Sequence, residues 1–229
     1  MKKAWVFVLA CLCVSAASAA DFKFFVGSSI STYSNRWPSL QTYAYESSGL
    51  NPFKNYKAAV TFGFGFTFPI YKSLSIEADV HYANGGADFK MWYVSSGTDG
   101  YEEYHDLRGV SLPVLIKAAF LPRPFPYILA GVDITYIINH RRQGFLLYQY
   151  GADEQWVGGL VEDFDPSTSK WNFGPILGLG LDFPLKRGAF FIEGRYSLGL
   201  TNLYQGAGGA EVMTRALYII AGYRVGASK

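Results

Sequence analysis

The chain has 229 residues, of which 50% are hydrophobic and 17% aromatic, and it carries 20 Lys and Arg against 18 Asp and Glu. Without Lys2 and Lys3, which we expect to be removed with an N-terminal leader, the chain has 18 Lys and Arg (20 − 2) against 18 Asp and Glu, and this net charge of about zero argues against nucleic-acid binding. Both cysteines, Cys11 and Cys13, lie in a leader that we expect to be removed, which excludes disulfide and thiol chemistry from the remaining chain.

The first 20 residues have the features of a secretory signal peptide. Lys2 and Lys3 form a positive start, an apolar core runs from Ala4 to Val14, and small residues at 17–20 offer a cleavage site. The apolar run is shorter than the roughly 20 residues of a membrane-spanning helix. Lipid attachment at Cys11 is disfavoured because Leu9 fits such a signal poorly. We therefore expect a cleaved signal peptide over 1–20 and one exported domain over 21–229.

After the leader, apolar and polar residues alternate in eight segments, the pattern of strands with one apolar and one polar face. In the second segment, phenylalanines at 62, 64, 66 and 68 alternate with small residues such as Gly63 and Gly65, which indicates a crowded interior opposite an apolar wall. In the fourth, Pro113 predicts a bulge, because proline cannot donate to a strand ladder. The predicted strands cover residues 22–33, 57–68, 74–84, 110–120, 127–138, 171–183, 190–202 and 214–225.

The connections between these strands alternate in length. Those after the second, fourth and sixth strands are short, whereas loops are predicted over 34–56, 85–105, 139–170 and 203–209. Short periplasmic turns, long outer loops and aromatic residues near the strand ends are typical of outer-membrane barrels. The sequence thus predicts an all-β fold, a closed antiparallel up-and-down transmembrane β-barrel of about eight strands. A soluble eight-stranded barrel with the phenylalanine row inside is the alternative.

Three segments resemble the PorT-like outer-membrane β-barrel proteins of the Bacteroidetes. The segment Val-Ser-Leu-Pro-Val-Leu-Ile-Lys at 110–117 is similar to a strand of that family, as are residues 173–180 and 195–202. Two features depart from the family: Ser111 stands where a glutamate is usual, and the chain ends in Gly-Ala-Ser-Lys rather than on an aromatic residue. The resemblance implies an outer-membrane barrel of a Gram-negative envelope and, through PorT, a link to type IX secretion.

The strand positions that we expect to point into the barrel carry nearly equal numbers of positive and negative side chains. An eight-stranded interior is just wide enough for side chains to fill, so these charges must pair. We expect Lys117 to meet Glu77 or Asp79, and the last three strands to join their own charges into a plug. A narrow ion or proton path is the alternative. The predicted interior set is Lys23, Glu77, Asp79, His81, Lys117, Asp133, Asp182, Glu193, Arg195 and Arg224.

Neither an enzyme site nor a cofactor site is expected. The three histidines, His81, His105 and His140, show no triad spacing. The acidic residues at 162, 163 and 165 could bind Ca²⁺ but lack a ligand-loop spacing, and the Gly-x-Gly runs lie inside strands rather than in a phosphate-binding loop.

The leading functional hypothesis is a non-enzymatic structural or interaction protein in secretion or envelope assembly. Trp37, Trp92 and Trp156 are the expected loop contacts with a partner protein, and Arg141 and Arg142 are expected to contact lipopolysaccharide phosphates. The partners implied are outer-membrane lipids and envelope or secretion proteins. A small pore or transporter and a lipid A-modifying enzyme are the two alternatives.

Overall fold

The computed structural model describes residues 20–34, 53–71, 73–93, 99–120, 125–150, 153–162, 167–206 and 211–226; the side chains of 53–55, 89–93, 99–102, 125, 145–150 and 153–162 are not described. The predicted signal peptide lies outside these residues apart from Ala20. No helix in the described ranges is long and apolar enough to cross a membrane. The strands are β1 (Asp21–Tyr33), β2 (Phe53–Tyr71), β3 (Leu74–Tyr93), β4 (Asp99–Ser111), β5 (Val114–Ala119), β6 (Phe125–Tyr150), β7 (Asp153–Glu162), β8 (Trp171–Leu185), β9 (Gly188–Leu198) and β10 (Thr214–Val225).

These strands form one antiparallel sheet that closes on itself. β1 pairs with β2 on one side and with β10 on the other, and the ring continues from β10 through β9, β8, β6 and β4 to β3. β4 and β5 act as one interrupted strand because both pair with β3 and β6, while β7 and β8 pair with successive parts of β6. The result is a ring of eight strands, which confirms the predicted fold.

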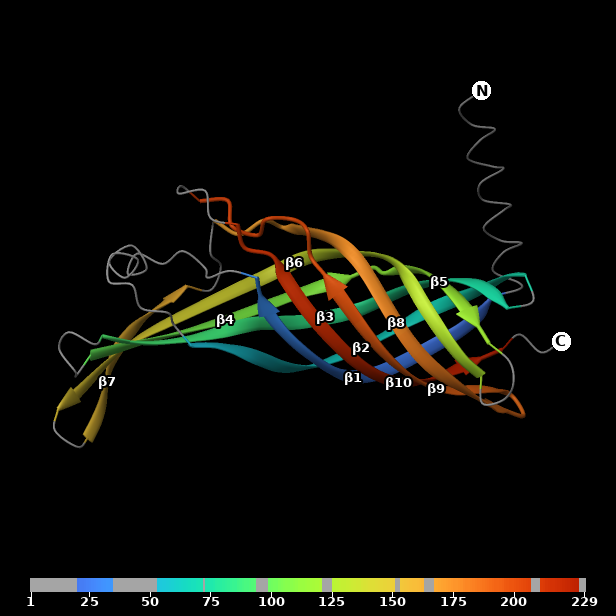
Figure 1. Ribbon diagram of the computed structural model, residues 1–229, viewed down its shortest axis with the longest axis horizontal. Coiled ribbons are helices and arrows are strands. Elements are labelled where there is room, and N and C mark those ends of the chain that lie inside the picture. Colours follow the sequence, from blue (N-terminus) through green and yellow to red (C-terminus); the bar gives the residue numbers. More distant parts are fainter. Residues whose placement is uncertain are drawn as a thin grey trace, which may run out of the picture.

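Both ends of the described ring differ in character. β1 begins and β10 ends at the same end of the barrel, on the right in Figure 1, which we name the lower end. The β6–β7 hairpin projects from the opposite end, on the left in Figure 1, which we name the upper end. The lower end has short connections, since β8 and β9 are joined by Lys186 and Arg187 alone. An even number of strands therefore brings both ends of the ring to one side.

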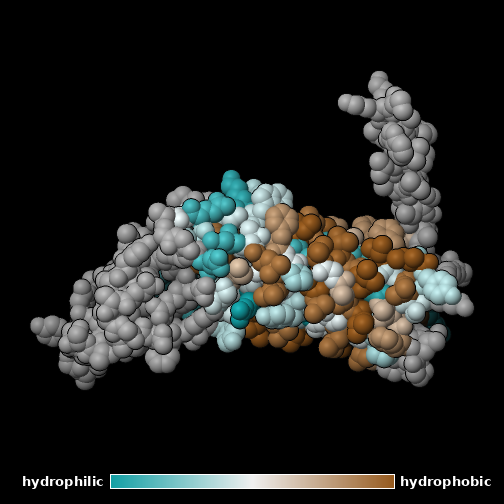
Figure 2. All heavy atoms as spheres, turned by 45° about the horizontal axis from the view of Figure 1, so that its top comes forward, coloured by the Kyte–Doolittle hydropathy of each residue, from teal (hydrophilic) through white to brown (hydrophobic). Residues whose placement is uncertain are grey.

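The outer wall of the barrel is apolar and its interior is polar. Phe62, Phe64 and Phe66 are 57%, 46% and 42% exposed, whereas Lys23 and Glu77 are completely buried. On the face shown in Figure 2, hydrophobic residues gather in a band on the wall, with hydrophilic residues on the side facing the β7 end. The soluble alternative required the phenylalanine row inside and is therefore wrong.

Aromatic side chains mark both edges of the apolar band. At the upper edge the rings of Tyr136 and Trp171 lie 4.9 Å apart in an edge-to-face contact, and at the lower edge Phe183 and Phe190 lie 6.1 Å apart. Tyr136, Trp171 and Phe183 are all exposed on the wall. Such belts place amphipathic or large aromatic rings at the two membrane–water interfaces.

The predicted bulge at Pro113 is wrong. The register between β3 and the β4–β5 strand is the same on both sides of the proline, from His81 opposite Ser111 to Ala78 opposite Val114. The Pro113 carbonyl still accepts a hydrogen bond of 3.1 Å from the Asp79 amide. The proline therefore removes one donor from the ladder, which interrupts the strand without inserting an extra residue.

Two of the predicted loops are wrong as well, because the strands continue through them. β3 extends to Tyr93 and β4 begins at Asp99, so the predicted loop 85–105 is mostly a hairpin. The predicted loop 139–170 contains the end of β6 and all of β7. Most of the predicted loop 34–56 cannot be compared, because residues 35–52 lie outside the described ranges. Its last four residues, 53–56, belong to β2, which begins at Phe53. Outside a bilayer neither strand face must be apolar, so the alternation that signals a strand disappears.

Candidate functional site

The most extensive polar site lies in the interior of the barrel. Lys23, on β1, has no exposed side-chain surface and donates through Nζ to the Glu77 carboxylate. Its Nζ also lies 3.0 Å from Asp79 Oδ1. Glu77 and Asp79 both come from β3, two residues apart, so they share the inward parity of that strand. One lysine thus bridges two fully buried carboxylates.

Arg195, on β9, extends this pair across the lumen. Its Nη1 donates to Asp79 Oδ2 at 2.7 Å, and its Nε donates to Glu193 Oε2 at 2.7 Å. The other oxygen of Glu193 accepts a hydrogen bond of 2.7 Å from the hydroxyl of Tyr127, on β6. Asp79 is therefore paired with two cations, and Glu193 has one charged and one neutral donor, the condition under which buried ions are tolerated.

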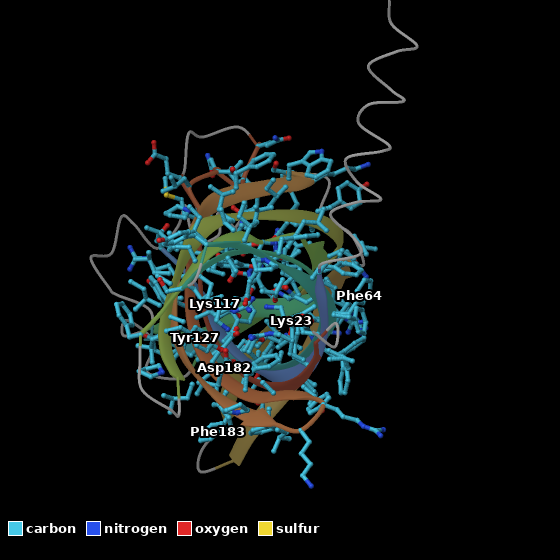
Figure 3. The ribbon with its side chains drawn as sticks, turned by 90° about the vertical axis from the view of Figure 1, so that its right-hand side faces the viewer. Lys23, Phe64, Lys117, Tyr127, Asp182 and Phe183 are labelled. Carbon is cyan, nitrogen blue, oxygen red and sulfur yellow. The ribbon has the colours of Figure 1, made fainter. Side chains whose placement is uncertain are left out.

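Three more charges close the lower part of the lumen. Asp182, on β8, accepts hydrogen bonds from Lys117 at 2.8 Å and from Arg224 at 3.0 Å. Lys117 Nζ lies 3.5 Å from Glu77 Oε1 and 3.5 Å from the centre of the Tyr127 ring. Seen from the lower end, Lys23, Lys117, Tyr127 and Asp182 lie inside the ring, whereas Phe64 and Phe183 point outward (Figure 3). Below this layer a cavity of about 450 Å³ opens at the mouth, lined in part by Lys117, Asp182 and Arg224.

Two predicted residues lie inside the barrel without joining the ion pairs. Asp133, on β6, accepts hydrogen bonds from the hydroxyls of Ser111 and Ser197, the latter at 2.8 Å, and has no cation within ion-pair distance among the described residues. His81 packs between the rings of Phe25 and Tyr218 at 6.1 and 5.4 Å, and neither ring nitrogen finds a hydrogen-bond partner in the described part of the chain.

The structure places all ten predicted interior residues inside the ring. Eight of them form one connected network of ion pairs: Lys23, Glu77, Asp79, Lys117, Asp182, Glu193, Arg195 and Arg224. The sequence did not single out Tyr127, Ser111 or Ser197 as partners in this interior. Parity alone places these three side chains inward, but it does not reveal which carboxylate each one reaches.

The upper part of the lumen is nearly filled. A cavity of about 40 Å³, lined by Asp133, Asn84 and Asn172 among others, has room for about one water molecule. Above it, buried apolar side chains pack into a cluster: Tyr33, Ala87, Ile137, Leu203 and Val212. The described interior thus consists of an apolar closure, a small polar cavity, an ion-paired middle and an open lower mouth.

A second polar site sits at the upper rim. His105 Nδ1 lies 3.0 Å from His140 Nε2, and His140 Nδ1 lies 2.6 Å from Thr168 Oγ1. On the other side, His105 Nε2 lies 3.2 Å from Glu103, which also pairs with Arg142 Nε at 2.5 Å. The antiparallel register of β4 and β6, with Leu107 opposite His140, brings these histidines together although they are 35 residues apart. Sequence spacing alone gives no sign of this pair.

The charges around this rim are also paired. Asp106 accepts a hydrogen bond of 2.5 Å from Arg108 and lies 3.4 Å from Lys57. The hydrogen bond from Arg108 to the Asp106 carboxylate raises the pKa of that exposed guanidinium, so it remains fully charged. Among the described side chains, no group of three or more histidines or acids converges on a point that could hold a metal ion.

The residues predicted as loop contacts divide into two groups. Arg142 is partly buried against Glu103, and Arg141 is exposed at the same rim. Trp37 lies outside the described residues, and the side chains of Trp92, in β3, and Trp156, in β7, are not described. The structure therefore brings Arg141 and Arg142 to one edge of the barrel and does not test the three tryptophans.

Residues 15–205 match the family model of the outer membrane protein beta-barrel domain. The chain belongs to this family. It is accordingly a protein of the outer membrane, so the lower end of the barrel faces the periplasm and the long hairpins face outward. No curated protein matches the chain.

Several solved structures are similar in fold. The outer membrane protein OprG from Pseudomonas aeruginosa is 13% identical, with a TM-score of 0.45, over 91% of this chain and 97% of that one. Neisserial surface protein A is 12% identical, with a TM-score of 0.38, over 90% and 98%. Ail of Yersinia pestis, solved with the heparin analogue sucrose octasulfate, is 12% identical, with a TM-score of 0.40, over 90% and 98%. Likeness at this level carries no argument about function.

Proposed function

We propose that this protein is a non-enzymatic outer-membrane anchor that presents an extracellular β-sheet to a protein partner. The observation that carries this proposal is the length of the strands at the upper end. β6 has 26 residues and β3 has 20, whereas a tilted strand crosses a bilayer with about 9–11. At about 3.3 Å per residue, β6 alone is roughly 85 Å long, more than twice the thickness of the hydrocarbon core.

The excess length is organised as a sheet. Pairing between β4 and β6 continues to Asp99 opposite Tyr148, and pairing between β6 and β7 runs from Arg142 opposite Glu162 to Tyr150 opposite Asp153. In Figure 1 these strands extend together away from the ring. A paired sheet displays a defined surface at a lower ordering cost than a flexible loop, which suits partner capture.

The filled lumen supports an interaction role over the pore alternative. The ion pairs of Lys23, Arg195 and Arg224 occupy the middle and the lower part of the lumen, and each cation has a carboxylate within 3.0 Å. An ion would have to displace these pairs to pass, at the cost of leaving buried charges without partners. The role in secretion or envelope assembly rests on the resemblance to PorT-like proteins alone.

The test is to remove the β6–β7 part of the sheet while keeping the barrel. Residues 143–161 are replaced by Asn-Gly, which makes a tight hairpin between Arg142 and Glu162, a pair already in register. We expect the variant to fold, shown by heat-modifiable mobility in gels, and to lose the proteins that co-purify with the wild type after gentle detergent extraction. Arg187→Gln, an exposed charge on a periplasmic turn, is the control and should keep them.

Two results would overturn the proposal. The shortened protein could capture the same partners in the same amounts as the wild type, which would remove the sheet from the function. Alternatively, the wild type could show steady conductance in planar bilayers that changes when Arg195 becomes Gln, which would favour the pore.

A further inference from the structure

The outer wall of the barrel carries a groove at the upper edge of the apolar band, separate from the interior and from the extracellular sheet. The groove encloses about 330 Å³ and is lined by Ile30, Thr32, Tyr56, Tyr196, Arg215 and Leu217. We propose that it binds lipopolysaccharide in the outer leaflet, with a lipid A phosphate on Arg215 and an acyl chain along the apolar residues below.

The strand registers arrange the lining in two rows. In the lower row, Ile30 stands opposite Leu217, which in turn stands opposite Tyr196. In the upper row, Thr32 stands opposite Arg215. A polar row above an apolar row matches a lipid whose charged headgroup lies at the interface and whose chains enter the hydrocarbon region.

The lower row continues into the lipid-facing wall. Ile30 is 40% exposed, Leu217 41% and Tyr196 44%, and all point to the same side as the phenylalanines of β1 and β2. Tyr56, at 71% exposure, flanks the upper row. An acyl chain in contact with the lower row would therefore leave the groove onto an apolar surface rather than into water.

Arg215, in the upper row, has no ion-pair partner among the described residues. It is exposed, and no described carboxylate lies within ion-pair distance of its guanidinium. The Thr32 hydroxyl beside it is buried, so Arg215 rather than Thr32 is the group that a ligand in the groove can reach. A phosphate oxygen beside this arginine would accept a charge-assisted hydrogen bond.

Arg215 also fits a lipid phosphate better than Arg142, one of the two arginines that the sequence suggested. The Arg142 Nε already lies 2.5 Å from Glu103, so a phosphate would have to compete with that carboxylate. Arg215 has no such competitor and stands directly above the apolar row. The groove therefore offers a cation for the lipid phosphate and an apolar surface for the acyl chain next to each other.

The test measures lipid binding by the full chain in a detergent with a sugar headgroup, which carries no competing phosphate. Native mass spectrometry and titration would compare lipid A, lipid A without its phosphates, and inorganic phosphate. We expect the wild type to bind lipid A and Arg215→Gln to bind it about tenfold more weakly, as expected for loss of a charge-assisted contact. Arg215→Lys should retain part of the affinity, and the control Arg187→Gln, on the periplasmic turn, should match the wild type.

Each remaining outcome decides the proposal. Equal lipid A binding by the wild type and Arg215→Gln, with both proteins folded by gel mobility, would overturn it. Binding of dephosphorylated lipid A as tight as that of lipid A would overturn recognition of the phosphate. Binding of inorganic phosphate as tight as that of lipid A would show a plain anion site and would overturn the lipid assignment.

Discussion

Replacing Lys23 by methionine is the sharpest test of the idea that the barrel is held closed by a buried charge network. Methionine keeps most of the volume of the lysine stem but removes the ammonium. The Lys23 Nζ bridges Glu77 and Asp79, and all three side chains are completely buried. The substitution therefore leaves two carboxylates in the interior with one cation fewer.

The expected cost follows from this geometry. Breaking a buried ion pair by removing one partner typically costs about 3–5 kcal/mol, because a charge is left without compensation. Asp79 retains Arg195 at 2.7 Å, and Glu77 retains Lys117 at 3.5 Å, so the lower part of that range, about 3 kcal/mol, is expected. Adding Glu77→Gln to Lys23→Met should recover part of the loss, because the two residues are coupled.

The assay is equilibrium unfolding in urea of the barrel reconstituted in lipid vesicles, with Lys186→Met as the control. Lys186 is exposed on the turn between β8 and β9, so its substitution should change the free energy of unfolding little. A loss of unfolding free energy below about 1 kcal/mol for Lys23→Met would be no larger than that expected for an exposed ion pair. That result would refute the argument that the interior charges are desolvated and mutually dependent.

Two further substitutions test the packing and the hydrogen bonds of the interior by the same unfolding assay. A Cβ at Gly180 would lie 2.5 Å from the Tyr127 ring, so Gly180→Ala should cost about 1–3 kcal/mol of unfolding free energy. A Cβ at Gly194 would have no atom within 4 Å, so Gly194→Ala should be close to neutral. Equal effects of the two substitutions would contradict this packing. Ser197→Ala removes a donor to the buried Asp133 carboxylate and should cost about 1.5–3 kcal/mol of unfolding free energy. Adding Asp133→Asn should reduce this loss. A neutral Ser197→Ala would contradict the assigned hydrogen bond.

The membrane part of the fold could be predicted because a bilayer imposes a rule on sequence. Every lipid-facing side chain must be apolar, so the alternation in β2 and β10 follows the wall residue by residue. β10 begins at Thr214 and ends at Val225, the same bounds as the predicted strand. The same rule separated the charged interior from the wall, which is why the inward positions of residues such as Glu193 followed from parity.

The rest could not be predicted, because it depends on register or lies in water. The extended parts of β3, β4 and β6 lie beyond the apolar band, where the bilayer no longer requires one face to be apolar, so their sequences lack the alternation that separates a strand from a loop. The pair of His105 and His140 depends on the alignment of β4 with β6, and Asp133 depends on hydroxyls from two other strands. Such side-chain contacts are determined by the register between strands and not by spacing along the chain.

The two proposed contact surfaces lie on different parts of the ring, and this separation is itself testable. The extracellular sheet grows from β3, β4, β6 and β7, whereas the lipid groove is built on β1, β2, β9 and β10. The ion-paired interior between them offers a rigid spacer rather than a bistable element, so we expect no coupling. Shortening the hairpin between Arg142 and Glu162 should leave lipid A binding unchanged, and Arg215→Gln should leave partner capture unchanged. Loss of both functions in either folded variant would show that lipid and partner share one site, and would contradict the assignment of separate surfaces.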